Sequence, residues 1–183
     1  MSIYKSAKES QIVMTQLMLP SHSNFSGKIH GGYVLNLMDQ VAFACASKHS
    51  GVYCVTASVN KVDFLNPIEV GELITLKASI NYTGNSSMLV GLRVEAENIQ
   101  RGIVKHCNSS YFTMVAKDDN GKKTKVPGLI LDSEESIRRF ARSMYRKKQS
   151  QEREKTFRPN GFLIEDYIEL VQSQNAKIDL KAS

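Results

Sequence analysis

The segment that most constrains the fold is an apolar stretch that is predicted to form one helix and that contains a single acid. From Tyr33 to about His49 there is no proline or glycine, and Gly51 follows as a natural C-terminal cap. Apolar residues cover nearly all faces of this helix, which is typical of a helix surrounded by protein. The acid, Asp39, lies about two turns after Gly32. The fold must therefore enclose the helix and accommodate a carboxylate on it.

The residues after Gly51 follow a period of two, which predicts strands. Apolar and polar residues alternate over residues 74–82 (ITLKASINY) and 90–97 (VGLRVEAE), and the turn sequence TGNSS lies between them. Further strands are expected at residues 12–19, 53–64 and 103–116. Five or six half-buried antiparallel strands around one helix predict an α+β domain in which a curved sheet wraps around a central buried helix.

The chain after residue 130 has a different character. Ser133, Glu134 and Glu135 are typical of a helix start, with Ser as the cap and acids in the first turn. Residues 136–148 (SIRRFARSMYRKK) contain six basic residues and no acid, and a shorter helix is expected over residues 162–172. We therefore expect two parts: a domain over residues 1–130 and a basic helical extension over residues 131–183, where an anionic partner would be sought first.

Composition excludes several classes of protein. With 183 residues, 42% of them hydrophobic and 23% charged, the chain has the composition of an ordinary globular protein. No apolar run approaches the roughly 18–20 residues that span a bilayer, and the N-terminus lacks the pattern of a secretory signal. Cys45, Cys54 and Cys107 lie in core-like patterns with no zinc-site spacing, so we expect free thiols, a cytoplasmic location and no metal.

The glycine pair and Asp39 are the strongest indication of chemistry. Glycines that open a helix expose backbone N–H groups at the positive end of its dipole, where a developing oxyanion can be held. Asp39 is expected to be largely desolvated and therefore a better base than an exposed aspartate. The structural alternative is a hydrogen-bonded core acid that caps a strand end or pairs across a subunit contact. The residues alone leave both interpretations open.

Four motifs carry a resemblance to a known family. NFSGKIHGGYVLNLMDQVA, VDFLNPIEVGEL, NYTGNSSM and NSSYFTMVA occur in an order and spacing that resemble the hotdog-fold acyl-CoA thioesterases, in the branch of the YciA-like and cytosolic acyl-CoA hydrolases. The resemblance covers about residues 5–127. It implies a hotdog fold, in which two subunits pair their sheets edge to edge, the active sites lie at the dimer interface and dimers assemble further, as a trimer of dimers in many members.

The resemblance also implies site residues. The catalytic acid of the family matches Asp39, and the Asn in the loop before the HGG motif matches Asn24, which would come from the partner chain. The backbone at Gly31 and Gly32 matches the region that polarises the thioester carbonyl. The implied reaction is hydrolysis of a fatty acyl-CoA, with Asp39 acting either as general base on water or as nucleophile through a transient anhydride, and with no cofactor or metal.

Other residues have two interpretations each. Asn24, taken alone, is more typical of a turn residue. His30 precedes the glycine pair and would contact substrate or make a structural hydrogen bond. Ser86 and Ser87 would meet the pantetheine or phosphates of CoA, or simply form a turn. The basic helix over residues 136–148 would hold a CoA phosphate or another nucleotide, or pack its apolar stripe on a neighbouring subunit; a nucleic-acid partner is not indicated, since no recognised motif is present.

Two other functions compete with thioester hydrolysis. A hotdog hydratase or dehydratase acting on 3-hydroxyacyl thioesters uses a histidine with a helix acid, and the predicted helix has no histidine before His49. A non-catalytic acyl-CoA or nucleotide sensor would use the basic extension for binding. The combination of Asn24, the HGG motif and Asp39 favours an enzyme.

Overall fold

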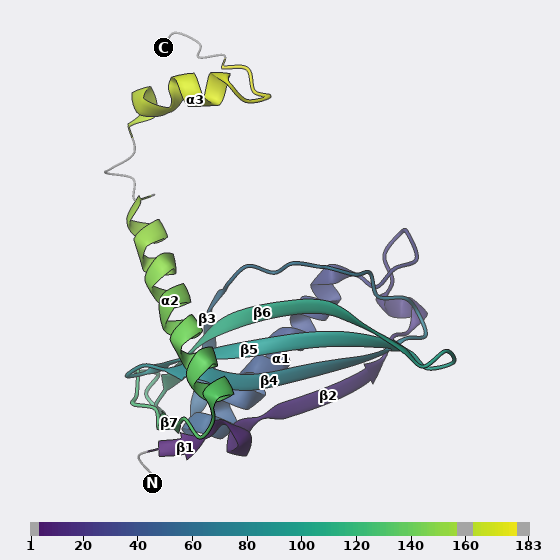
Figure 1. Cartoon of the computed structure of the whole chain (residues 1–183), viewed down its shortest axis with the longest axis vertical. Coiled ribbons are helices and arrows are strands. Elements are labelled where there is room, and N and C mark those ends of the chain that lie inside the picture. The colour runs from purple at the N-terminus through teal and green to yellow at the C-terminus, as the bar shows by residue number, and fades with distance from the viewer. Residues whose placement is uncertain (1–3, 157–162, 179–183) are drawn as a thin grey trace. The chain divides into compact units, whose positions relative to one another are not determined.

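The computed structural model describes residues 4–156 and 163–178 (Figure 1). The chain divides into two units, residues 1–143 and residues 144–183, and the division falls within helix α2. The division at residue 130 that the sequence suggests stays a prediction. The first unit contains the sheet, the central helix and the predicted catalytic and substrate-binding residues, whereas the basic segment over residues 136–148 spans both units.

Helix α1 (Gly31–Ser50) is two residues longer at its start than predicted, because the glycine pair forms its first turn. It ends where expected, at Gly51, whose φ of 74° is the left-handed conformation that glycine adopts without strain. Its buried residues recur at three- and four-residue spacing on one stripe (Val34, Leu37, Met38, Val41, Ala42, Cys45, Ala46, His49). The expectation of a helix enclosed on all sides is wrong for the single chain, since Asn36, Gln40 and Phe43 are exposed.

Five antiparallel strands form one sheet, in the order β2-β4-β5-β6-β3. Their bounds are β2 (Ile12–Leu17), β3 (Tyr53–Val59), β4 (Leu73–Thr83), β5 (Ser87–Asn98) and β6 (Ile103–Lys117). Figure 1 shows α1 lying along one face of this sheet. The buried positions of the long strands alternate, as in Ile74, Leu76, Ala78 and Ile80 of β4, and pack with the buried stripe of α1 into one core. A sheet on one helix confirms the predicted fold class.

The strand predicted over residues 53–64 is wrong beyond Val59. Residues 60–66 run beside β6 but are held by scattered contacts instead of a regular ladder. Asn60 N–H donates to the Tyr111 carbonyl at 2.9 Å, and the buried Asn108 side chain donates from Nδ2 to the Asp63 carbonyl at 2.8 Å. The alternation in the sequence breaks at Asn60 and Lys61, which are both polar, and regular pairing of β3 with β6 ends just before them, at Val59.

A second, parallel sheet was not predicted. Strand β1 (Tyr4–Ser6) pairs with β7 (Gly128–Ile130), and the short 3₁₀ helix η1 (Ala7–Ser10) follows β1. A Cβ on Gly128 would lie 2.6 Å from the Tyr4 ring, so any larger residue there would have to displace that ring. Strands of three residues are too short to show a period, which is why the sequence did not reveal them.

The C-terminal elements are helical, as predicted. Helix α2 (Glu134–Thr156) begins after Ser133, whose Oγ accepts a hydrogen bond from the Ser136 N–H at 3.2 Å. Within the first unit, the Phe140 ring lies 5.0 Å from the Tyr82 ring of β4. In place of one helix over residues 162–172, the described residues form a 3₁₀ helix (Ile164–Tyr167) and α3 (Ile168–Gln172), while residue 162 lies outside the described part.

Candidate active site

Asp39 lies on the side of α1 that faces strand β3. Its carboxylate oxygen Oδ1 accepts a hydrogen bond from Thr56 Oγ1 at 2.5 Å. The side chain is half-buried in the chain, so the expectation of a largely desolvated acid is wrong for one subunit. The reason is that Asp39 flanks the buried stripe of α1 instead of lying within it, next to the exposed residues Asn36, Gln40 and Phe43.

Thr56 is a site residue that the sequence analysis missed. It stands on β3, opposite Met114 of β6, and the pairing of these strands shifts register between Thr56 and Ser58. Such a β-bulge re-aims the side chains beside it, and bulges are frequent next to functional sites. Threonine is common in strands, so no local pattern indicates that this hydroxyl reaches the helix acid. The bond fixes the carboxylate and leaves Oδ2 without a partner among the described residues.

His30 caps the start of α1. Its Nδ1 accepts a hydrogen bond from the Gly32 N–H at 3.0 Å, and a Cβ on Gly32 would lie only 3.1 Å from that nitrogen. This bond means that the neutral ring carries its proton on Nε2. The Gly32 N–H is therefore engaged within the chain and is not a free donor for a thioester carbonyl.

Gly31 supplies the N–H that remains at this terminus. No acceptor for it is found among the described residues, and it lies at the positive end of a 20-residue helix with no acid in its first turn. The Phe64 ring lies against Gly31, 3.2 Å from where a Cβ would be. Together with His30 Nε2–H, this N–H gives the helix start two donors that could bind a carbonyl oxygen.

Asn24 organises the loop before α1, as its turn interpretation predicted. Its Oδ1 accepts hydrogen bonds from the Ser26 N–H, Ser26 Oγ and the Lys28 N–H at 2.9, 2.8 and 3.2 Å. The loop closes through Asn24 N–H to the Lys28 carbonyl at 2.7 Å, and Gly27 takes a φ of 77°. Because Oδ1 is engaged, the amide Nδ2 is the group that Asn24 can offer to a ligand.

The candidates form two groups within one chain. Asn24, His30 and the glycine pair lie at the start of α1, whereas Asp39 with Thr56 lies eight residues further along. At 1.5 Å per residue this separation is about 12 Å along the helix axis. One chain therefore does not bring Asn24 and Asp39 onto the same reacting group.

Ser86 and Ser87 belong to the β4–β5 turn and to the first residue of β5. Ser87 pairs with Val115, which in turn pairs with Val55 beside Thr56. This row places Ser87 two strand spacings from Val55, or about 10 Å. Its side chain alternates with the buried Met88 and so lies on the opposite face of the sheet from the helix. Both serines make backbone turn contacts, Ser86 through its carbonyl to Ala116 N–H and Ser87 to Gly84 N–H.

The strand beside Asp39 is an edge. β3 pairs with β6 and, among the described strands, has no neighbour on its other side. Exposed apolar side chains surround this edge (Phe43, Tyr53, Val59, Phe64, Leu65). An unpaired edge with an apolar border is the kind of surface that pairs with another chain.

Within the described residues, no group of three or more His, Cys, Asp or Glu side chains is arranged to hold a metal ion. No helix in this part of the chain has the length and apolar character needed to cross a membrane. All three cysteines are free thiols and buried, as predicted.

Comparison with known proteins identifies the family. The sequence profile of the family described as "Thioesterase superfamily" matches residues 26–103. The acyl-CoA thioester hydrolase YkhA of Bacillus subtilis, described as uncharacterized, is 35% identical over 71% of this chain and 76% of its own length. The chain belongs to the thioesterase superfamily. Protein VdlD of Helicobacter pylori is 43% identical over 77% of this chain and 80% of its own length.

Solved structures of thioesterases have the same fold. A hexameric acyl-CoA thioesterase in its apo form superposes with a TM-score of 0.81 at 34% identity, over 85% of this chain and 99% of that one. An acyl-CoA hydrolase from Staphylococcus aureus, solved with butyryl-CoA, CoA and CoA disulfide, has a TM-score of 0.78 at 29% identity, over 93% of this chain and 99% of that one. Variants of that thioesterase with one Asp, one Asn or one Thr replaced by Ala have also been solved.

Proposed function

We propose that this protein is an acyl-CoA thioesterase, which hydrolyses an acyl-CoA to a free acid and CoA. The hotdog fold, the match to the thioesterase superfamily and the acyl-CoA hydrolases among its relatives support this function. The observation that carries the proposal is the Asp39 carboxylate, held at one oxygen by Thr56 and open at the other, beside an unpaired sheet edge.

Asp39 is the reacting acid in this proposal. The Thr56 hydroxyl occupies Oδ1 and orients the carboxylate, so Oδ2 is the reacting atom. It takes a proton from the water that adds to the thioester carbon, or it attacks that carbon to give a mixed anhydride that water then hydrolyses. In both routes the C–S bond breaks and CoA leaves as the thiolate. The side chain is half-buried in one chain. A second subunit over the β3 edge would cover it, and this would strengthen every electrostatic interaction in the site.

The start of α1 in the partner subunit binds the thioester carbonyl oxygen, because about 12 Å along the helix axis separates it from Asp39 of the same chain. The Gly31 N–H and His30 Nε2–H are the donors, supported by the positive end of the helix dipole. As the carbonyl carbon becomes tetrahedral, negative charge develops on this oxygen, so donors fixed in advance stabilise the transition state more than the substrate. A thioester is already an activated acyl group, so a base and these donors suffice without a cofactor.

A second subunit completes the site. The separation of about 12 Å along α1 keeps Asn24 from Asp39 within a chain, so Asn24 Nδ2 would act on the thioester or water at the Asp39 of the partner. The free β3 edge and its apolar border support pairing of two sheets. Hexameric acyl-CoA thioesterases among the structural neighbours support a trimer of dimers.

Ser86 and Ser87 stay candidates for CoA contact, and only across a subunit boundary, since Ser87 lies on the face away from α1. Three basic residues of α2 are in ion pairs, Arg138 and Arg139 with Glu135 and Lys148 with Glu152, and a contact of this helix with a CoA or nucleotide phosphate stays a prediction. A cytoplasmic location is supported by relatives named as cytosolic hydrolases.

The test is release of CoA from a panel of short, medium and long acyl-CoAs. Wild-type protein should release CoA from some members, and Asp39→Asn should lose this activity while keeping the thermal unfolding midpoint of wild type. Formation of an enoyl-CoA would indicate a hydratase or dehydratase. That alternative is disfavoured because His49, the histidine on α1, is buried and hydrogen-bonded to Ser10 and to the Pro127 carbonyl. Tight CoA binding without turnover would indicate a sensor.

A further inference from the structure

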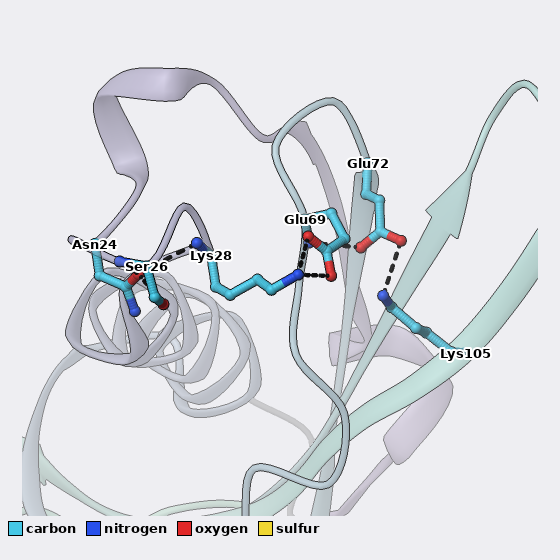
Figure 2. Close-up of polar contacts among 6 residues, drawn as sticks. All are labelled: Asn24, Ser26, Lys28, Glu69, Glu72 and Lys105. Carbon is cyan, nitrogen blue, oxygen red and sulfur yellow. Dashed lines mark hydrogen bonds and ion pairs between the residues drawn. The ribbon is translucent and has the colours of Figure 1, made fainter.

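A continuous line of polar contacts joins the Asn24 loop to the sheet (Figure 2). The Lys28 N–H donates to Asn24 Oδ1 at 3.2 Å, and Lys28 Nζ contacts both carboxylate oxygens of Glu69 at 2.6 and 2.7 Å. The Glu69 N–H donates to Glu72 Oε2 at 2.8 Å, and Glu72 Oε1 pairs with Lys105 Nζ at 2.8 Å. The line thus runs from the loop, through the connection that precedes β4, to strand β6.

The inner end of this line is buried. The Glu72 side chain is 7% exposed, and that of Lys105 is 27% exposed. A buried carboxylate is costly unless it is paired and hydrogen-bonded, and Glu72 has both kinds of partner. The pair therefore fixes the backbone of residues 69–72, where Gly71 takes a φ of 86°, in one position against the sheet.

The outer end of the line holds the loop. Lys28 and Glu69 form an antiparallel bridge, and their side chains add a two-oxygen ion pair to it. Lys28 also contacts Asn24 twice through its backbone, from its N–H to Oδ1 and from its carbonyl to the Asn24 N–H. A displacement of Lys28 would therefore move the Asn24 amide directly.

We propose that Lys28, anchored through Glu69 to the buried Glu72–Lys105 pair, is a positioning residue for Asn24. This inference rests on the proposed function, in which Asn24 Nδ2 acts at the reacting centre. The charge of Lys28 is neutralised by both oxygens of Glu69, so the side chain serves as a brace and not as a site for CoA phosphate. The motif NPIEVGE, whose two acids had no assigned role, gains one as the support of the loop.

The first test compares kcat and KM for three variants. Lys28→Met removes the ion pair and keeps the length of the side chain, and we expect kcat to fall about tenfold or more because small displacements of a positioned group are costly. KM for acyl-CoA should stay within about threefold of the wild-type value, since the contacts that bind the substrate before reaction are retained. Lys28→Arg should restore most of the loss. The matched control is Lys77→Met, which removes an ion pair to Glu95 of the same 2.6 Å length on β4 and β5 and should change kcat by less than about twofold.

The second test asks whether Lys28 acts through Asn24. In an Asn24→Ala background, adding Lys28→Met should cause no further fall in kcat, because the group that Lys28 positions is already absent. An equal fall in both backgrounds would overturn the proposal while leaving the thioesterase function intact. A rise in KM for Lys28→Met that is larger for substrates that carry more of the CoA phosphates would also overturn the proposal, because Lys28 would then be a phosphate contact.

A third readout does not depend on activity. Lys28→Met, and Glu72→Gln at the buried end, should speed amide hydrogen exchange at residues 26 and 28, whose N–H groups are held by Asn24 Oδ1. Lys77→Met should not. Unchanged exchange in both variants would overturn the positioning role, whether or not the protein is active. Inactivity of the wild type on every acyl-CoA would, by itself, reject only the proposed function.

Discussion

The hydrogen bond from Thr56 to Asp39 leads to a specific prediction about catalysis. Thr56→Val replaces the hydroxyl by a methyl group of similar size, so Asp39 Oδ1 loses its donor at 2.5 Å while the strand keeps its shape. A hydrogen bond to a charged group contributes about 1.5–3 kcal/mol. This bond is exposed to water in the single chain, so we take the lower end, which corresponds to about a tenfold fall in kcat.

The assay is continuous release of CoA at saturating acyl-CoA, with Thr56→Ser as the matched variant. Serine keeps the donor, and its kcat should lie within about threefold of wild type. KM should change little in either variant, because Thr56 orients the acid and is not proposed to bind CoA. Equal kcat values for wild type, Thr56→Ser and Thr56→Val would refute the view that Asp39 must be held by this strand.

Three further predictions follow from the described contacts. In Gly32→Ala, the new Cβ would lie 3.1 Å from His30 Nδ1. Loss of the His30 cap would cost about 0.5–2 kcal/mol of stability, while alanine would stabilise the helix by about 0.5–1 kcal/mol. The thermal unfolding midpoint should therefore change little while kcat falls, and a large fall in both the midpoint and kcat would contradict this. Burial lowers the pKa of His49 below its ordinary 6.5, so on acidification the unfolded chain binds a proton that the folded chain does not. The free energy of unfolding should therefore fall as pH drops below about 6.5. Urea titrations should show a shallower fall with pH for His49→Gln than for wild type, and an equal dependence on pH in the two proteins would contradict this. Burial raises the pKa of the Cys45 thiol to about 12, so a thiol reagent should label the cysteines far more slowly in folded than in urea-unfolded protein, and rapid labelling of the folded chain would be inconsistent with their burial.

The long helix and the long strands could be predicted from the sequence because each periodic segment extends over many residues. The alternation over β4 and β5 and the apolar run of α1 each extend over enough residues to fix the type of element. The pair β1 and β7 has three residues per strand and depends on the close approach of Gly128 to Tyr4, which no local pattern records. The predicted strand also included residues 60–64, although the alternation breaks at Asn60 and Lys61, where the pairing of β3 with β6 ends as well.

The site could be predicted from the sequence only in part. Asp39 and the glycine pair stand out because a lone acid and a diglycine are unusual in an apolar helix. The Thr56 contact depends on a bulge between two strands that are far apart in sequence, and the capture of the Gly32 N–H by His30 depends on the rotamer of one side chain. The exposure of Asp39 depends on what covers the β3 edge, which is a property of an assembly and not of a segment.

In the proposed function, Asp39 of one chain and Asn24 of another serve the same thioester. This arrangement is tested by mixing two impaired variants, Asp39→Asn and Asn24→Ala, through co-expression or through unfolding and refolding them together. In a mixed dimer one site carries both substitutions and the other carries neither, so acyl-CoA hydrolysis by the mixture should rise well above that of either parent. If the mixture is no more active than its parents although mixed dimers are shown to form, the shared site is contradicted.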